Sequence, residues 1–303
     1  MGKKPILISG IHRSGSTWVG KVVAKSKNVK YVSEPFNVAM KDYVPPFDEW
    51  YKYVSSNSEQ QEQDVIKRYL DKRIYLNRDF ILNRLQRMNS IQKLKYLVRD
   101  SFERLNKRSL LKDPIALFSA EWIFNQYNCD VVILIRHPAA FYLSIKEKDW
   151  TFNFENLAKQ PLILDGPLKE FKDTIQNMCS TENSLIEQAV LIWNCIYTQV
   201  YNYQRKYSDK WHFLKHEDLS RKPLHEFEEM FNFLNLNFDS QVKSYILKTT
   251  TSNNDSLLER NSINNITKWQ KKLTEDEISY IKKETESVWR LFYTNDDWLS
   301  TTK

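Results

Sequence analysis

The chain has 303 residues, of which 41% are hydrophobic and 27% are charged, and its net charge at pH 7 is +7. This composition excludes a disordered chain, and the length suffices to bury one large core or two smaller ones. A basic balance fits a polyanionic cofactor, an acidic acceptor, nucleic acid or a membrane surface, so charge alone does not choose among them. The three cysteines show no C-x-x-C spacing, which argues against a disulfide framework or a zinc site and favours a reducing compartment.

The N-terminus passes from Met-Gly-Lys-Lys directly into an apolar run, leaving no room for a cleavable signal. Ile6 stands where a myristoylation motif has Ser or Thr. No segment approaches the ~18–20 apolar residues of a membrane span. We therefore expect a cytoplasmic protein without an integral membrane segment.

The first predicted strand, residues 5–9, is followed by the loop Gly10-Ile11-His12-Arg13-Ser14-Gly15-Ser16-Thr17 and by helical spacing over residues 17–24. A strand, a glycine-containing turn and a helix N-terminus direct several backbone N–H groups at one anion. In nucleoside triphosphatases this loop reads G-x-x-x-x-G-K-[ST], and its lysine reaches the β- and γ-phosphates. Here Ser16 replaces that lysine and Arg13 supplies the positive charge. The loop predicts a phosphate site unsuited to a γ-phosphate; the alternative is an ordinary turn in which Ser14 or Ser16 caps the helix.

Four later segments, residues 28–33, 109–111, 131–135 and 211–215, have the pattern of further strands. Helical patterns separate most of them, which predicts an α/β fold with a parallel sheet flanked by helices on both faces. Ligands of such sheets bind beyond the carboxyl ends of the strands. We expect the polar residues at these ends to converge on one site: Arg13, Glu34, Lys112, Arg136 and Glu217.

Two long, mostly helical stretches, at about residues 47–107 and 152–207, exceed plain crossovers and are predicted to cap the sheet. They serve either as structural cover or in acceptor recognition. The sequence contains no internal repeat or convincing linker, so we predict a single domain over residues 1–303.

A second phosphate element is predicted at the end of residues 131–135. Arg136 stands at the strand end, Pro138 suits the first turn of a helix, and Ser144 lies one further turn along. Arginine offers a forked donor for phosphate, and the serine hydroxyl adds another. Taken singly, a salt bridge for Arg136 and a helix surface for Ser144 are equally acceptable. Together with the first loop, the pair indicates a nucleotide with phosphates at two separated positions.

With these motifs the chain resembles the sulfotransferase superfamily, whose donor is 3′-phosphoadenosine 5′-phosphosulfate. Residues 13–18 look like the family's 5′-phosphosulfate loop, and residues 136–144 look like its 3′-phosphate element. The resemblance extends to Glu34-Pro35, Lys112-Asp113-Pro114, Glu217-Asp218-Leu219 and Thr267-Lys268-Trp269. The pattern is closer to bacterial, carbohydrate and tyrosylprotein sulfotransferases than to the cytosolic small-molecule branch. It implies a P-loop-like nucleotide-binding fold, with the two helical inserts unmatched.

The resemblance assigns a role to each matching residue. Sulfuryl transfer needs a base for the acceptor proton and positive charge over the leaving 5′-phosphate. The donor-binding set is Arg13, Ser14, Gly15, Ser16, Thr17, Trp18, Arg136, Ser144 and Lys268. Arg13 would stabilise the leaving phosphate, Lys112 the sulfuryl group in transfer, and Lys268 would close over the donor. Trp18 either packs near the adenine or belongs to the core.

Glu34 is the expected base, because it ends the second predicted strand where related enzymes place a catalytic glutamate. The alternatives are a structural ion pair for Glu34 and a base role for His216. His12 replaces a proline of many relatives and is expected to contact only phosphate.

The expected reaction transfers a sulfuryl group to a hydroxyl acceptor, with no metal required. The resemblance and the aromatic-rich inserts favour a carbohydrate, such as a polysaccharide or a glycolipid. The oligomeric state stays open. Two other classes also remain: a P-loop nucleotide or small-molecule kinase, and a basic nucleic-acid-binding protein. For the latter the sequence shows no recognised binding motif, so no nucleic-acid partner is expected.

Overall fold

A five-stranded parallel sheet forms the centre of the protein, and the computed structural model describes residues 3–40, 43–75, 81, 82, 85, 90–251 and 262–299. The strands are β1 (Ile6–Gly10), β2 (Val29–Ser33), β3 (Arg108–Lys112), β4 (Asp130–Ile135) and β5 (His212–Lys215), in the spatial order β2-β3-β1-β4-β5. The α/β fold with a parallel sheet is confirmed. Because β1 lies between β3 and β4, the chain order reverses at β1, which is where such sheets bind ligands.

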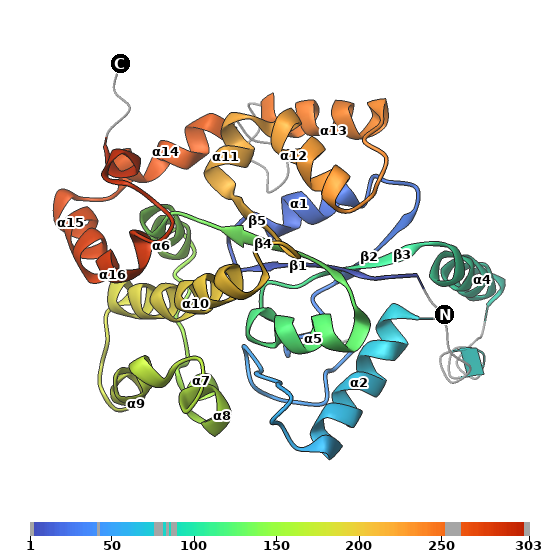
Figure 1. Cartoon of the computed structure of the whole chain (residues 1–303), viewed down its shortest axis with the longest axis horizontal. Helices are drawn as coiled ribbons and strands as arrows, with labels where there is room; N and C mark the ends of the chain where they lie inside the picture. The colour runs from blue at the N-terminus through green and yellow to red at the C-terminus, as the bar shows by residue number, and fades with distance from the viewer. Residues whose placement is uncertain are drawn as a thin grey trace.

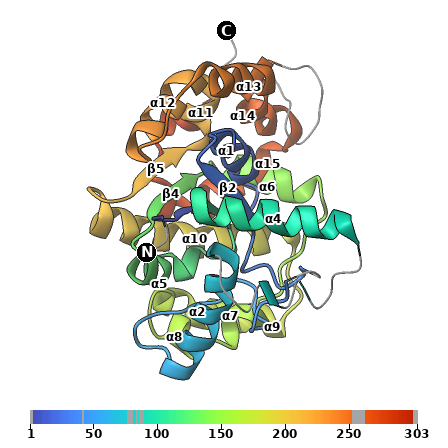
Figure 2. The ribbon, with the colours of Figure 1, turned by 90° about the vertical axis from the view of Figure 1, so that its right-hand side faces the viewer.

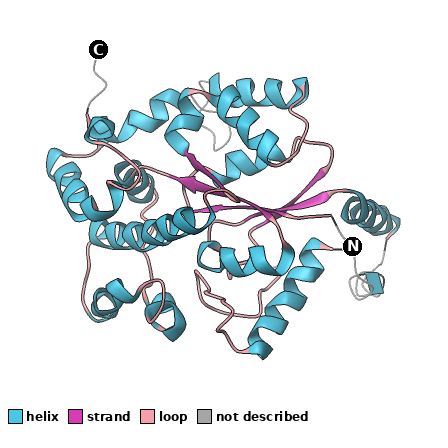
Figure 3. Ribbon diagram, in the orientation of Figure 1, coloured by secondary structure: helices cyan, strands magenta, loops and turns pink. Residues whose placement is uncertain are grey.

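Helices cover both faces of the sheet (Figures 1 and 3). One face carries α1 (Ser16–Val23), α11 (His216–Arg221), α12 (Pro223–Phe233), α13 (Ser240–Thr251) and α14 (Ser262–Lys272). The other carries α2 (Gln60–Ile74), η1 (Leu117–Ser119), α5 (Ala120–Tyr127) and α10 (Leu185–Tyr207), with α7 (Glu155–Ala158), α8 (Pro161–Leu164), η2 (Lys169–Phe171) and α9 (Lys172–Ser180) beyond them. Beside β4 and α10 lie α6 (Pro138–Lys146), α15 (Glu275–Glu284), α16 (Glu286–Trp289) and η3 (Asn295–Trp298).

The alternation of side chains along β1 divides the core into two layers. Ile6 and Ile8 pack with α1, α12 and α13, whereas Leu7 packs with α2, α5 and α10. Successive residues of a strand point to opposite faces, so a continuous apolar strand fills both layers at once.

The β2 edge of the sheet is covered by α4 (Ile91–Asn106), as Figure 2 shows. An ion pair between Lys30 of β2 and Asp100 joins the two elements. Arg104 also pairs with Asp100 and donates to the carbonyl of Lys72, so α4 is tied to the end of α2. A covered edge strand offers no unpaired ladder to another chain.

The first predicted insert, residues 47–107, contains α2 and α4, and part of it lies outside the described residues. The second, residues 152–207, is mostly helical, as expected: residues 151–153 belong to no helix or strand, and short helices follow before α10. The single domain over residues 1–303 stays a prediction. In the part of the chain that the structure describes, no helix is both long and apolar enough to cross a bilayer.

Candidate active site

The loop between β1 and α1 has the backbone of an anion-binding turn. Gly10, Arg13 and Gly15 all have positive φ, at 148°, 65° and 91°. A Cβ on Gly15 would lie 2.6 Å from Nδ1 of His216, so only glycine fits there. Gly15 is itself the N-cap of α1 and provides no capping side chain, which leaves the first turn of α1 open to an anion. The alternative of a turn capped by Ser14 or Ser16 is therefore not what the structure has.

The two predicted phosphate elements meet through Arg13. Its Nε donates to Oγ of Ser144 at 2.9 Å, and its carbonyl oxygen accepts from Nη1 of Arg136. They line a cavity of about 410 Å³ together with Lys148 and Lys268. Further lining comes from Ala140, Leu143, Glu147 and Asn265. Its lining contains four cationic side chains and one carboxylate, which suits a phosphorylated ligand. We call it the nucleotide cavity.

Arg136 is fixed in place by the long helix α10. Its backbone N–H donates to the hydroxyl of Tyr197 at 2.8 Å, and its carbonyl accepts from Nε1 of Trp193 at 3.0 Å. α10 begins at a capping box of Ser184 and Glu187, which sets its start beyond the sheet. Two buried aromatic residues of one helix thus hold the main chain where β4 ends.

Glu34 and Lys112 form an ion pair at the ends of neighbouring strands β2 and β3. The other carboxylate oxygen of Glu34 accepts from Nδ2 of Asn37 at 2.7 Å. The Lys112 side chain runs over α1 at Gly20, where an added Cβ would come within 2.9 Å of its Cγ. Both residues are thereby held at the carboxyl edge of the sheet.

Asp113 joins the loops that follow β2 and β3. Its buried carboxylate accepts from the N–H groups of Phe36 at 2.6 Å, Ile115 at 3.0 Å and Ala116 at 3.2 Å. Burial raises the pKa of this carboxyl to about 7. These contacts position the loop that carries Glu34.

Glu217 lies against the end of β4, next to Arg136. Its buried carboxylate accepts from the backbone N–H of His137 at 3.1 Å and from the hydroxyl of Tyr293 at 2.9 Å. Burial raises the pKa of Glu217. β5 is the edge strand next to β4, so the carboxylate that follows it reaches the start of α6.

His216 and Trp18 lie behind the phosphate loop. The His216 ring contacts Gly15 and meets Trp18 edge-on at 6.3 Å. Trp18 Nε1 donates to Oγ1 of Thr249 at 3.0 Å, and its ring packs against Phe227 at 5.1 Å. These are core contacts, and a base role for His216 or an adenine contact for Trp18 stays a prediction.

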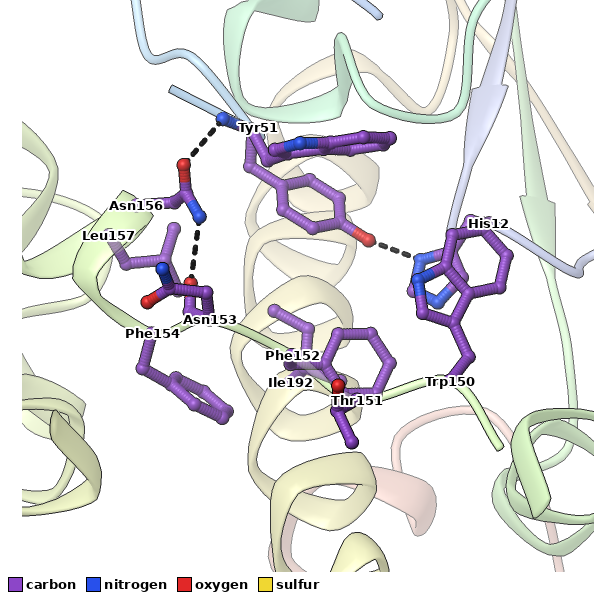
Figure 4. A pocket seen from close by; sticks show the side chains of 11 residues that line it. His12, Tyr51, Trp150, Thr151, Phe152, Asn153, Phe154, Asn156, Leu157 and Ile192 are labelled. Carbon is purple, nitrogen blue, oxygen red and sulfur yellow. Dashed lines mark hydrogen bonds between the residues drawn. The ribbon is translucent and has the colours of Figure 1, made fainter. Parts of the chain in front are cut away.

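A second cavity, of about 430 Å³, is lined by His12 and was not identified from the sequence (Figure 4). We call it the aromatic cavity. Its walls are mostly aromatic or amide side chains: His12, Trp50, Tyr51, Trp150, Thr151, Phe152, Asn153, Phe154, Asn156, Leu157 and Ile192. The available signal was the aromatic spacing of Trp150, Phe152 and Phe154. The expectation that His12 contacts only phosphate must be amended, because its ring lines this cavity.

Comparisons with known proteins identify the class. A family model of the sulfotransferase domain matches residues 3–298, and the chain belongs to this family. It is an enzyme that uses 3′-phosphoadenosine 5′-phosphosulfate as sulfuryl donor. No curated protein sequence matches the chain significantly.

Solved structures of sulfotransferases resemble the chain along nearly its whole length. The sulfotransferase domain of the curacin biosynthetic pathway is 13% identical with a TM-score of 0.48, covering 93% of this chain and 97% of that one. The sulfotransferase of Alicyclobacillus acidocaldarius is 11% identical with a TM-score of 0.47, covering 98% and 99%. Mouse sulfotransferase SULT7A1, complexed with PAP, is 10% identical with a TM-score of 0.46, covering 97% and 86%.

Proposed function

We propose that the enzyme transfers the sulfuryl group of 3′-phosphoadenosine 5′-phosphosulfate to a hydroxyl group of a carbohydrate. The observation that carries the donor half is the meeting of Arg13, Ser144 and Arg136 at one cationic cavity beside the phosphate loop. A nucleotide with phosphates at two positions needs donors at both, and these residues supply them. A cytoplasmic location agrees with the three free thiols.

Arg13 and the first turn of α1 stabilise the leaving 5′-phosphate in this proposal. Charge that develops on the bridging oxygen is neutralised by a guanidinium and by backbone N–H groups fixed before the reaction begins. Ser14 supports this role, since its buried hydroxyl has no hydrogen-bond partner among the described residues. A buried donor of this kind is costly unless a ligand satisfies it. Ser16 and Thr17 add hydroxyls on the same turn, while Arg136, Ser144 and Lys268 bind the 3′-phosphate.

Glu34 accepts the proton of the acceptor hydroxyl, and Lys112 supplies positive charge to the transferred group. Their ion pair holds a carboxylate and an ammonium side by side at the edge where β2 and β3 end. A structural pair alone would fit the same contact. The catalytic role is therefore tested by substitution.

Glu34→Gln keeps the size and the hydrogen-bonding capacity of the side chain but removes the base. We expect kcat to fall by roughly 10²- to 10⁴-fold, the usual contribution of general base catalysis. Affinity for adenosine 3′,5′-bisphosphate, measured by calorimetry, should not change. Glu286→Gln, which alters an exposed glutamate paired with Arg290, is the matched control and should retain full activity. Unchanged kcat in Glu34→Gln would leave only the structural ion pair.

The reaction itself is tested with ³⁵S-labelled donor and a panel of glycans, phenols and peptides. Transfer to a glycan, with tight binding of adenosine 3′,5′-bisphosphate, is the expected result. Failure of that nucleotide to bind would overturn the donor assignment. Transfer only to phenols or peptides would overturn the carbohydrate assignment and leave the donor intact. Magnesium-dependent ATP binding tighter than that of the nucleotide would favour a kinase.

A further inference from the structure

The aromatic cavity lies directly beside the phosphate loop. His12 lines it, and the next residue, Arg13, lines the nucleotide cavity. The remaining walls come from Trp50 and Tyr51, from residues 150–157, and from Ile192 of α10. At about 430 Å³ it has the size of a small-ligand pocket. A ligand held here is therefore adjacent to the loop that binds the donor.

His12 is a buried polar group in the aromatic part of this cavity. Its side chain is only 6% exposed and is surrounded by the rings of Tyr51, Phe141, Trp150 and Phe152, with centroids 5.0–6.0 Å away. Nδ1 forms a hydrogen bond with the Tyr51 hydroxyl, as Figure 4 shows. Nε2 is buried and has no hydrogen-bond partner in the described part of the chain.

The imidazole stays neutral at physiological pH. Burial, with a smaller contribution from the neighbouring Arg13, lowers the pKa of His12 to about 3. A group that protonates only in strong acid is a poor general base near neutrality. A neutral ring whose Nδ1 is engaged by Tyr51 still presents Nε2 as a donor or an acceptor. Leaving such an atom unsatisfied is unfavourable, so a ligand that fills this hydrogen bond gains affinity and specificity.

The shape and the walls of the cavity select the ligand. The rings of Tyr51, Trp150 and Phe152, which line the cavity with His12, are tilted by 51–52° from the imidazole plane, so none of them forms with it the parallel slot that a flat aromatic molecule needs. Thr151 and Asn153 add polar side chains at the exposed rim. A pyranose ring presents C–H groups to aromatic faces and hydroxyls to polar atoms, and therefore matches this lining.

We propose that the aromatic cavity binds a sugar ring of the acceptor and that Nε2 of His12 hydrogen-bonds one of its hydroxyls. Tyr51 is the positioning residue that fixes the imidazole, and Trp150 is a wall on which the ring stacks. His12 thus determines acceptor specificity and is not the base. The proposal rests on the sulfotransferase reaction described above, whose base is Glu34.

The test measures binding of methyl β-D-glucopyranoside, methyl β-D-galactopyranoside and 4-nitrophenol to the protein saturated with adenosine 3′,5′-bisphosphate, by ligand-observed NMR. At least one glycoside should bind the native protein. His12→Phe should weaken that binding by 10-fold or more, while His12→Gln, which restores a polar group, should recover part of it. Tyr51→Phe should have a smaller effect in the same direction. For any glycoside that the enzyme sulfates, the effects of these substitutions should appear in KM more than in kcat.

Trp150→Ala keeps the test valid if His12 variants fail to fold, because Trp150 is 39% exposed. It should also weaken glycoside binding by 10-fold or more with an unchanged melting temperature. Tyr280→Ala, at a 36% exposed aromatic on α15, is the matched control and should change nothing. Binding of 4-nitrophenol but neither glycoside, binding of no probe, or glycoside binding unaffected by both His12→Phe and Trp150→Ala would overturn the proposal. Nucleotide affinity, measured in the same samples, reports separately on the sulfotransferase assignment.

Discussion

Single residues of this protein carry contacts that the sequence indicates only in part. The proximity of Arg13 to the Arg136 element was expected, and its role at the phosphate loop stays a prediction. The direct bond from Arg13 to Ser144 was not, because it joins residues separated by 131 positions and depends on how α6 leaves β4. His12 was misjudged, since its environment is created by rings from positions 51, 141, 150 and 152. Sequence spacing contains no information on such a meeting.

Arg13→Ala separates catalysis from folding. Loss of the guanidinium removes charge stabilisation of the leaving phosphate, and we expect kcat/KM to fall by about 10²- to 10³-fold. Because the Arg13 side chain is half-buried in a cavity and not in the core, the free energy of unfolding should change by less than about 1 kcal/mol. Steady-state kinetics and urea unfolding check the two halves. Arg290→Ala is the control for the loss of an arginine elsewhere. Full activity in Arg13→Ala would mean that the loop has only a structural role.

His137 makes the stability of the folded protein depend on pH. Its ring stacks on Trp269 at 5.0 Å and meets Trp298 at 4.4 Å, and burial lowers its pKa to about 3. The unfolded chain takes up this proton near pH 6.5 and the folded chain does not. The stability contributed by the neutral ring is therefore present above pH 6.5 and lost as the pH falls, by up to about 1.4 kcal/mol per unit.

His137→Phe should abolish that part of the dependence. Between pH 7.5 and pH 5.0 the native protein should lose roughly 2 kcal/mol more stability than the variant does. Urea unfolding at both values measures the difference, in which His12, Asp113 and Glu217 cancel because both proteins contain them. Equal losses in the two proteins would mean that His137 is protonated in the folded state.

Elements were predicted better than their contacts. Every expected strand is present within a few residues, since an unbroken apolar run such as Val131 to Ile135 has few other uses. The order of the strands could not be predicted from the sequence, because strand pairing connects segments as distant in the chain as β1 and β3. The second insert is mostly helical, as expected, although its first two residues belong to no helix or strand. The aromatic residues at its start line the aromatic cavity and contact the core.

The turn that joins β1 to α1 is the element most sensitive to a small change. Gly15→Ala introduces a Cβ at φ 91° and 2.6 Å from His216, and we expect a cost on the order of 1–3 kcal/mol in stability. Affinity for adenosine 3′,5′-bisphosphate should fall with it, because the N–H groups of the turn are displaced. The double variant Gly15→Ala/His216→Ala should regain only the stability that the clash with His216 costs. Thermal unfolding and calorimetry measure both effects, and a Gly15→Ala protein of native stability and affinity would contradict the assigned backbone.

At the scale of the whole molecule, the proposed donor site joins parts that are distant in the chain. The nucleotide cavity takes residues from the β1 loop, the β4 end with α6, and α14. The ion pair of Lys268 with Glu147 at 2.7 Å joins α14 to the residue that follows α6. A bound nucleotide adds interactions that the unfolded chain cannot make.

Adenosine 3′,5′-bisphosphate should therefore raise the melting temperature in proportion to the logarithm of its concentration. At 100 times the dissociation constant the gain is about 2.7 kcal/mol. Arg136→Ala should abolish the shift within the same concentration range, whereas Arg290→Ala should retain it. Differential scanning calorimetry gives the measurement. A shift that survives in Arg136→Ala would place the nucleotide elsewhere.

The two cavities differ in what builds them. The nucleotide cavity is held by ends of regular elements, where Trp193 and Tyr197 of α10 hold Arg136 by hydrogen bonds. Apart from His12 and Ile192, the aromatic cavity is lined by residues 50–51 and 150–157, outside the strands and the long helices. Exchange of these two segments should therefore change which acceptor is sulfated, while β1, β4 and α10 keep the donor site unchanged.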